Sequence, residues 1–193
     1  MKELIKDYKK YRWFITSTGI LVVGGKNATQ NDELLKKIKK IKEDFIVMHT
    51  ASPGSPFSII LEDVNKINEA DLDETAIFTG CFSQAWKSGK KAEIDIFKIS
   101  QINKSKIMKA GTWRVSGKIE RMKVSLRLSL VRQKGVLRGV PAKYIKKKDS
   151  LLIIEPGKKI KDEIADEIIK RLGEGFKREE VLSALPAGGI KYE

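Results

Sequence analysis

The residues with the clearest ligand-binding chemistry lie where an apolar run meets a polar stretch that opens a predicted helix. The run Leu21–Val23 ends in Gly24-Gly25, and Lys26-Asn27 follow directly. Glycine lets the backbone approach a ligand closely, and the free N–H groups at the start of a helix favour an anion. The junction is therefore suited to a phosphate or a carboxylate group.

Patterns for catalysis and metal binding are scarce. The one histidine, His49, ends a predicted strand without a nucleophile or an oriented acid at a useful spacing, and the one cysteine, Cys81, lies on an apolar helix. The junction at 24–26 is not a P-loop, which needs a longer glycine-framed loop. Acids at 62–63 and 71–73 could bind Mg²⁺, but solubilising a loop and a helix start is the simpler interpretation. We expect no catalytic residue, no metal and no cofactor.

The net charge points to a polyanionic partner. The 193 residues carry 39 Lys and Arg against 25 Asp and Glu, a formal net charge of +14. Such an excess is typical of proteins that bind nucleic acid and, less often, of proteins that bind an anionic membrane surface. Residues 98–148 hold 16 basic residues and one acid, Glu120, whereas acids gather at 62–74. We therefore expect a basic face and a more acidic face.

The chain shows no sign of export. Its N-terminus lacks the apolar core of a signal peptide, and no apolar stretch approaches the roughly 18 residues of a membrane-spanning helix. A single cysteine allows no internal disulfide. We expect a cytoplasmic protein that does not bind membranes.

The first half predicts short helices and strands around a hairpin. The expected elements are a basic helix over 1–11, a hairpin around the Ser-Thr-Gly turn at 17–19, a helix over 29–42 capped by Thr29, strands at 45–49 and 57–61, and a largely buried helix from the Asn68 cap to about Trp86. The lysines at 36–42 are explained equally well as a solvated helix face or as a track for phosphates. Trp13, Trp86 and Trp113 lie in apolar contexts, so core packing is the better interpretation of each.

The second half changes to a period of two, which predicts strands at 94–99, 113–119 and 122–130. In the last, Val124, Leu126 and Leu128 alternate with Lys123 and Arg127, so one face is core and the other is basic. Further strands are expected at 136–144 and 151–154, then a helix over 160–172 and a short helix ending at 185. The fold class is α+β, a mostly antiparallel sheet with packed helices and a C-terminal helix pair. We expect one domain over 1–157, with 158–193 packed on it as an extension.

Five segments in the same order along the chain resemble the NFACT-R family of ribosome quality-control factors. They are Arg-Trp-Phe with Gly-Gly-Lys-Asn (12–14 and 24–27), His-x-x-x-Pro-Gly-Ser (49–55), Ser-Gln-Ala-Trp-Lys (83–87), Gln-Ile-Asn-Lys (101–104), and Gly-Thr-Trp with Gly-Lys (111–113 and 117–118). The resemblance covers about residues 11 to 131. Two positions depart from the family pattern: Asp32 stands where Glu is frequent, and Pro56 stands where many members have His.

The resemblance implies a standalone RNA-binding module that contacts tRNA or ribosomal RNA, in ribosome-associated quality control or tRNA metabolism, with the ribosome as a possible partner. The chemistry of phosphates and base edges favours two groups of contact residues. They are Lys26, Asn27, Gln30 and Asn31 at the helix start, and Arg114, Lys118, Lys123 and Arg127 on the sheet.

Two other functions stay open. An RNA-processing enzyme could use His49 or the acids near Glu62, and an adaptor could work through the helix pair at 160–185. The acids of that helix pair would repel a phosphate backbone, so we expect RNA to dock on the sheet.

Overall fold

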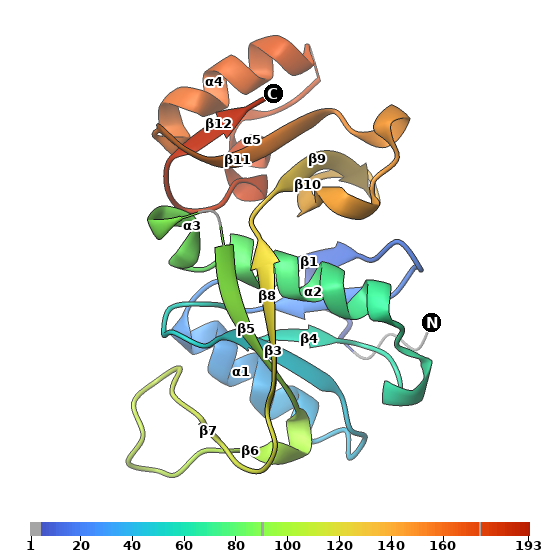
Figure 1. Ribbon diagram of the computed structural model, residues 1–193, viewed down its shortest axis with the longest axis vertical. Helices are drawn as coiled ribbons and strands as arrows, with labels where there is room; N and C mark the ends of the chain where they lie inside the picture. Colours follow the sequence, from blue (N-terminus) through green and yellow to red (C-terminus); the bar gives the residue numbers. More distant parts are fainter. Residues whose placement is uncertain (1–4, 90, 174) are drawn as a thin grey trace.

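The computed structural model describes residues 5–89, 91–173 and 175–193 (Figure 1). The larger of its two main sheets consists of β1 (Arg12–Ile15), β2 (Leu21–Gly24), β3 (Ile46–Thr50), β4 (Ser58–Ile60), β5 (Lys91–Lys98) and β8 (Glu120–Ser125). The smaller consists of β9 (Leu128–Gln133), β10 (Val136–Pro141), β11 (Leu152–Lys159) and β12 (Ile190–Tyr192). A short ribbon pairs β6 (Ile102–Asn103) with β7 (Arg114–Val115).

The helices are α1 (Ala28–Lys39), α2 (Glu69–Cys81), α3 (Ala85–Ser88), α4 (Lys161–Leu172) and α5 (Arg178–Ala184). Short 3₁₀ helices lie at Tyr8–Lys10, Val64–Lys66, Ile99–Gln101, Ala142–Tyr144 and Lys147–Asp149. The larger sheet has the order β1-β2-β4-β3-β5-β8 and the smaller the order β10-β9-β11-β12, and every pairing is antiparallel. The expected α+β class is confirmed.

Two helices cover opposite faces of the larger sheet. Leu34, Leu35 and Ile38 of α1 pack into one apolar cluster with Trp13 and Phe45. Helix α2 packs into a second cluster, which also contains the inward side chains of the smaller sheet and of α4 and α5. Helix α2 therefore contributes to the apolar core of both sheets. Because it is covered on several sides, eight consecutive residues from Glu74 to Cys81 are buried.

Buried acids of α2 hold the turn of the first hairpin. Asp71 accepts hydrogen bonds from the hydroxyls of Thr16 and Thr18, and Glu74 accepts from the N–H and the hydroxyl of Ser17. Burial raises the pKa of Glu74 above its usual value. The expectation that the acids at 71–73 solubilise a helix start is wrong for Asp71, because its side chain is fully buried and anchors the hairpin together with the buried Glu74.

The edge of the larger sheet is joined to the smaller one by a side chain. Gln133, at the end of β9, accepts from the N–H of Ile15 at 2.8 Å and donates to its carbonyl at 2.7 Å. These two bonds satisfy backbone groups of the edge strand β1 that would otherwise lack a partner. Strand β1 therefore faces β10 across the junction of the two sheets.

Several expected elements differ from those in the structure. The strand expected over 122–130 is two strands, because the chain leaves the larger sheet after Ser125 and enters the smaller one at Leu128, while Leu126 stays buried against α2. The strand expected at 113–119 is reduced to β7. The expected alternation of buried and exposed residues is present, but the two strands that carry it pair with neighbours in two different sheets.

Three further boundaries also differ. The cap of α1 is Asn27 and not Thr29, and the helix from Asn68 ends at Cys81, with α3 following separately. Of the helix expected over 1–11, the described residues form one 3₁₀ turn at Tyr8–Lys10, and residues 1–4 lie outside the described part. The C-terminal tail forms β12, which was not expected. The division of the chain after residue 157 stays a prediction.

Candidate functional site

A cleft of about 590 Å³ lies beside the start of α1. Its walls come from β1, from the β2–α1 junction, from the loop between β3 and β4, from the segment between α2 and α3, and from the loop before β7. Four of the five segments that carry the family resemblance therefore meet here, although they are far apart in the sequence. The volume lies within the range of small-ligand sites, which is about 300–1,000 Å³.

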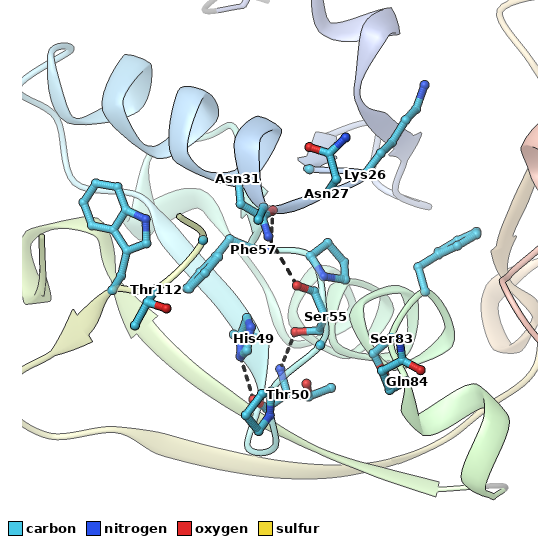
Figure 2. A pocket seen from close by; sticks show the side chains of 18 of the residues that line it. Lys26, Asn27, Asn31, His49, Thr50, Ser55, Phe57, Ser83, Gln84 and Thr112 are labelled. Carbon is cyan, nitrogen blue, oxygen red and sulfur yellow. Dashed lines mark hydrogen bonds between the residues drawn. The ribbon is translucent and has the colours of Figure 1, made fainter. Parts of the chain in front are cut away.

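The start of α1 is built from a reciprocal pair of hydrogen bonds. Asn27 accepts from the N–H of Gln30 at 2.9 Å, and the side chain of Gln30 accepts from the N–H of Lys26 at 3.0 Å. The two amides thus fix the backbone of the junction. The Lys26 side chain is exposed and extends outward from it (Figure 2).

Asn31 ties the helix to the opposite wall. Its side-chain oxygen accepts from the N–H of Phe57, and its amide nitrogen donates to the carbonyl of Ser55, whose hydroxyl in turn accepts from the N–H of Thr50 (Figure 2). A Cβ on Gly25 would lie 2.2 Å from the Asn31 oxygen. Glycine is required at position 25 because Asn31 occupies that space.

Asp32 anchors the loop that closes the far side of the cleft. Its carboxylate accepts from Trp113 Nε1 at 2.8 Å, from the N–H of Gly111 at 3.1 Å and from Lys104 at 2.7 Å. Burial by itself would raise the pKa of Asp32, but these hydrogen bonds outweigh it and lower the pKa. Trp113 is half-buried, because it packs against the edge of the apolar cluster of α1 and also lines the cleft, whereas Trp13 and Trp86 are fully buried in the core as expected.

His49 is held as a neutral ring. Burial lowers its pKa, and Nδ1 lies 2.7 Å from the carbonyl of Thr50, which can only accept a hydrogen bond. The proton therefore sits on Nδ1, and Nε2 is left as an acceptor. The ring packs against Phe57 with centroids 4.4 Å apart.

Arg12 is the residue of the cleft that sequence reasoning missed. It lines the cleft from β1, and its guanidinium lies 4.4 Å from the ring centre of Phe82. Burial, together with the positive charge of Arg138, lowers its pKa to about 10. The available signal was a positive charge beside Trp13 at the start of an edge strand, which is weak compared with the long basic run at 98–148.

The basic residues proposed on the sheet come from different elements. Lys123 lies on β8 opposite Glu93, whereas Arg127 falls between β8 and β9 and forms salt bridges with Glu155 and Glu193. Arg114 is exposed on the β6–β7 ribbon, and Lys118 is exposed in the following loop.

The charge pattern in the sequence is partly neutralised in space. Within the described part of the chain, five of the 16 basic residues in 98–148 have an acidic partner within 4 Å. For four of the five, the partners lie outside both the basic segment 98–148 and the acidic segment 62–74. The five are Lys104, Arg121, Arg127, Arg132 and Lys143. The expected separation into a basic and an acidic face is therefore incomplete.

The described residues contain no group of three or more His, Cys, Asp and Glu side chains that could hold a metal ion. None of the helices in that part of the chain has the length and apolar character needed to span a bilayer. Cys81 is buried, and burial raises the pKa of its thiol far above the usual value.

The chain is similar to a known protein in sequence and to another in fold. The chain is 29% identical to the archaeal Rqc2 homolog aRqcH of Methanocaldococcus jannaschii over 199 residues, which cover 96% of this chain and 29% of that protein. The chain thus spans less than a third of the length of this relative. The structure of the C-terminal part of the fibronectin/fibrinogen-binding protein from Streptococcus suis matches with a TM-score of 0.54 and 20% identity, over 60% of this chain and 45% of that one, and this match supports the fold alone.

The family model of the NFACT protein RNA binding domain matches residues 10–117, which is more than half of the chain. The matched range contains β1 to β7 and the segments that line all but one edge of the cleft. This chain therefore belongs to the NFACT RNA-binding domain family.

Proposed function

We propose that this protein binds structured RNA, with tRNA or ribosomal RNA as its target, and that it acts in the cytoplasm in ribosome-associated quality control or tRNA metabolism. Three observations support this function. The chain belongs to an RNA-binding domain family, its archaeal relative is named as an Rqc2 homolog, and its net charge is +14.

The charge of the cleft is the main structural support for this proposal. Arg12 and Lys26 are the cations that line it, and the acid that lines it, Asp95, is bound to Arg121 at 2.7 Å. The cleft therefore keeps an excess of positive charge beside the first N–H groups of α1. Such an arrangement favours a phosphate, and half-buried aromatic rings such as Trp113 offer an unpaired base a surface to pack against.

Within this proposal the predicted residues have different roles. Lys26, Arg114, Lys118 and Lys123 contact phosphates, while Asn27, Gln30 and Asn31 fix the backbone that presents the junction. Arg127 joins the contact when RNA displaces the carboxylates of Glu155 and Glu193.

We propose no chemical step on the RNA. His49 is neutral with Nδ1 engaged, and Glu62 is paired with Lys66 at 3.6 Å on the surface. Neither lies beside a nucleophile held by an oriented base. The described geometry therefore supports a binding role.

The test is fluorescence anisotropy with a labelled tRNA transcript across a series of salt concentrations. With about four phosphates contacted, log K should fall against log salt with a slope of about −3. A DNA duplex of equal length is the control and should bind more weakly. A flat salt response would contradict the proposal, and so would shortening of the tRNA in the presence of Mg²⁺, which would favour the enzyme.

A further inference from the structure

Four cations, from β1, the β2–α1 junction, β10 and the start of α4, lie close enough to interact electrostatically. They are Arg12, Lys26, Arg138 and Lys161. Arg12 interacts electrostatically with each of the other three, and all but Lys26 are half-buried. Like charges packed together in partly buried positions are unfavourable unless a negative charge joins them.

The acids near this cluster are engaged elsewhere. Glu180, which acts on Arg138, accepts from the N–H of Leu137 at 2.7 Å and pairs with Arg132 at 3.6 Å. Asp162, which acts on Lys161, is 3.3 Å from Arg178. The nearby negative charge is therefore already matched by other cations.

The two arginines are positioned by aromatic rings. The guanidinium of Arg12 lies 4.4 Å from the ring centre of Phe82, and that of Arg138 lies 4.4 Å from the ring centre of Trp13. Stacking on a ring holds a guanidinium in place and leaves its N–H edge available. Nε of Arg138 is buried and has no hydrogen-bond partner among the described residues, so this donor is unsatisfied.

Burial has an electrostatic consequence in this cluster. The pKa values of Arg12, Lys26, Arg138 and Lys161 all lie below their usual values, mainly because burial disfavours the charged form. Elsewhere in the chain, cations such as Lys10, Lys37, Arg121 and Lys143 have raised pKa values because carboxylates pair with them. A bound anion would reverse the shift in the cluster.

We propose that Arg12, Lys26, Arg138 and Lys161 form a phosphate subsite at the edge of the cleft, and that it holds a phosphate of an unpaired nucleotide whose base enters the cleft. The assignment of that phosphate to RNA rests on the function proposed above. The subsite spans the family-matched region, which supplies Arg12 and Lys26, and the smaller sheet with α4, which supply Arg138 and Lys161.

The first experiment uses inorganic phosphate as the probe and thermal unfolding as the readout. Phosphate should raise the unfolding temperature of the wild type more than chloride does at equal ionic strength, because a ligand of the folded state stabilises it. In Arg12→Gln and Lys161→Gln this phosphate effect should disappear, while the phosphate-free variants are at least as stable as the wild type because repulsion is relieved. A wild-type response no larger than that to chloride would overturn the subsite.

Arg171→Gln is the matched control. Arg171 also lies over a ring, 5.4 Å from the centre of Tyr192, but within the described part of the chain it does not interact electrostatically with any of the four cations of the cluster. Its removal should leave the phosphate effect intact. Equal losses in the control and in the Arg12 variant would mean that general charge, and not the subsite, produces the response.

The second experiment uses a short oligoribonucleotide with either a 5′-phosphate or a 5′-hydroxyl. A terminal phosphate in the subsite should make the phosphorylated form bind about tenfold more tightly, whereas an internal phosphodiester gives equal affinities that both fall in Arg12→Gln. If the wild type binds neither RNA but responds to phosphate through Arg12, the subsite stands and the RNA function fails. If RNA binding is the same in Arg12→Gln and Lys161→Gln as in the wild type, the function stands and the subsite fails.

Discussion

Two basic regions of this molecule differ in what surrounds their charges. The strand region at Lys123 and Arg127 has the higher density of basic residues in the sequence, yet Arg127 contacts two carboxylates and Lys123 lies opposite Glu93. The cleft edge has few basic residues in the sequence, but Arg12 and Lys26 meet there beside an acid that is already paired. An anion binds where the fold leaves positive charge without an acidic partner. The density of basic residues along the sequence does not show where that is.

The largest expected effect tests a buried residue of the strand region, which lies between Lys123 and Arg127 in the sequence. Leu126 is buried where the chain passes from one sheet to the other, and it packs against Gly80 of α2. Leu126→Ala should lower the free energy of unfolding by about 2–5 kcal/mol through the cavity that it leaves. Urea denaturation measures the change. Ser125→Ala is the control, since that side chain is exposed, and a similar loss in both variants would contradict the packing role of Leu126.

A smaller loss is expected at the wall of the cleft. Asp32→Ala removes the carboxylate that Lys104 and Trp113 share. The side chains of Lys104 and Asp32 are each only about 15% exposed, so Lys104 would lose its partner in a mostly buried position. We expect a decrease in unfolding free energy of about 2–4 kcal/mol, and weaker RNA binding because the 104–113 loop is released.

The neighbouring acid provides a matched control for this prediction. Glu33 is exposed and pairs with surface lysines, so Glu33→Ala should change stability by about 1 kcal/mol or less. Because the pKa of Asp32 is lowered, its contribution is present above the usual Asp pKa and is lost as the pH falls through the lowered value. The stability gap between wild type and Asp32→Ala should therefore narrow in acid.

The sequence was sufficient for elements that depend on local chemistry. The hairpin at 12–24, the helix that begins near residue 28 and the Asn68 cap of α2 follow from turn residues, periodicity and capping preferences within a few residues. The split of the strand at 122–130 could not be predicted in this way. Its alternation fits one strand as well as two, and the break depends on α2 lying between two sheets.

The cleft was predictable only in part, for a related reason. Its segments were each identified through family resemblance, but their meeting depends on the order β2-β4-β3-β5 of the larger sheet. Arg12, Arg138 and Lys161 come from β1, β10 and the start of α4, so no spacing in the sequence connects them. Asn27, Gln30 and Asn31 were chosen for their polar side chains, which the structure uses for hydrogen bonds within the protein.

The next prediction compares the two basic regions directly through RNA binding. If Arg12 and Lys26 each contact a phosphate, Arg12→Gln with Lys26→Gln should flatten the slope of log K against log salt by about two units. Lys123→Gln with Arg127→Gln should flatten it by about one unit, because carboxylates already neutralise Arg127. Anisotropy with the same tRNA measures both variants. The reverse order of effects would move the RNA contact to the strand region.

The smallest expected effect uses the single histidine as a reporter of the cleft. Burial lowers the pKa of His49 below the ordinary 6.5, so an NMR titration of its ring protons should show a midpoint below that value. Folding favours the neutral ring, so its contribution to stability is present above pH 6.5 and is lost as the pH falls from 6.5 to the lowered pKa. A phosphate bound at the cleft edge stabilises the protonated ring, so adding phosphate should move the midpoint upward in the wild type but not in Arg12→Gln. A midpoint that ignores phosphate in both proteins would show that the anion does not reach the cleft, and the contrast between the two basic regions would lose its electrostatic basis.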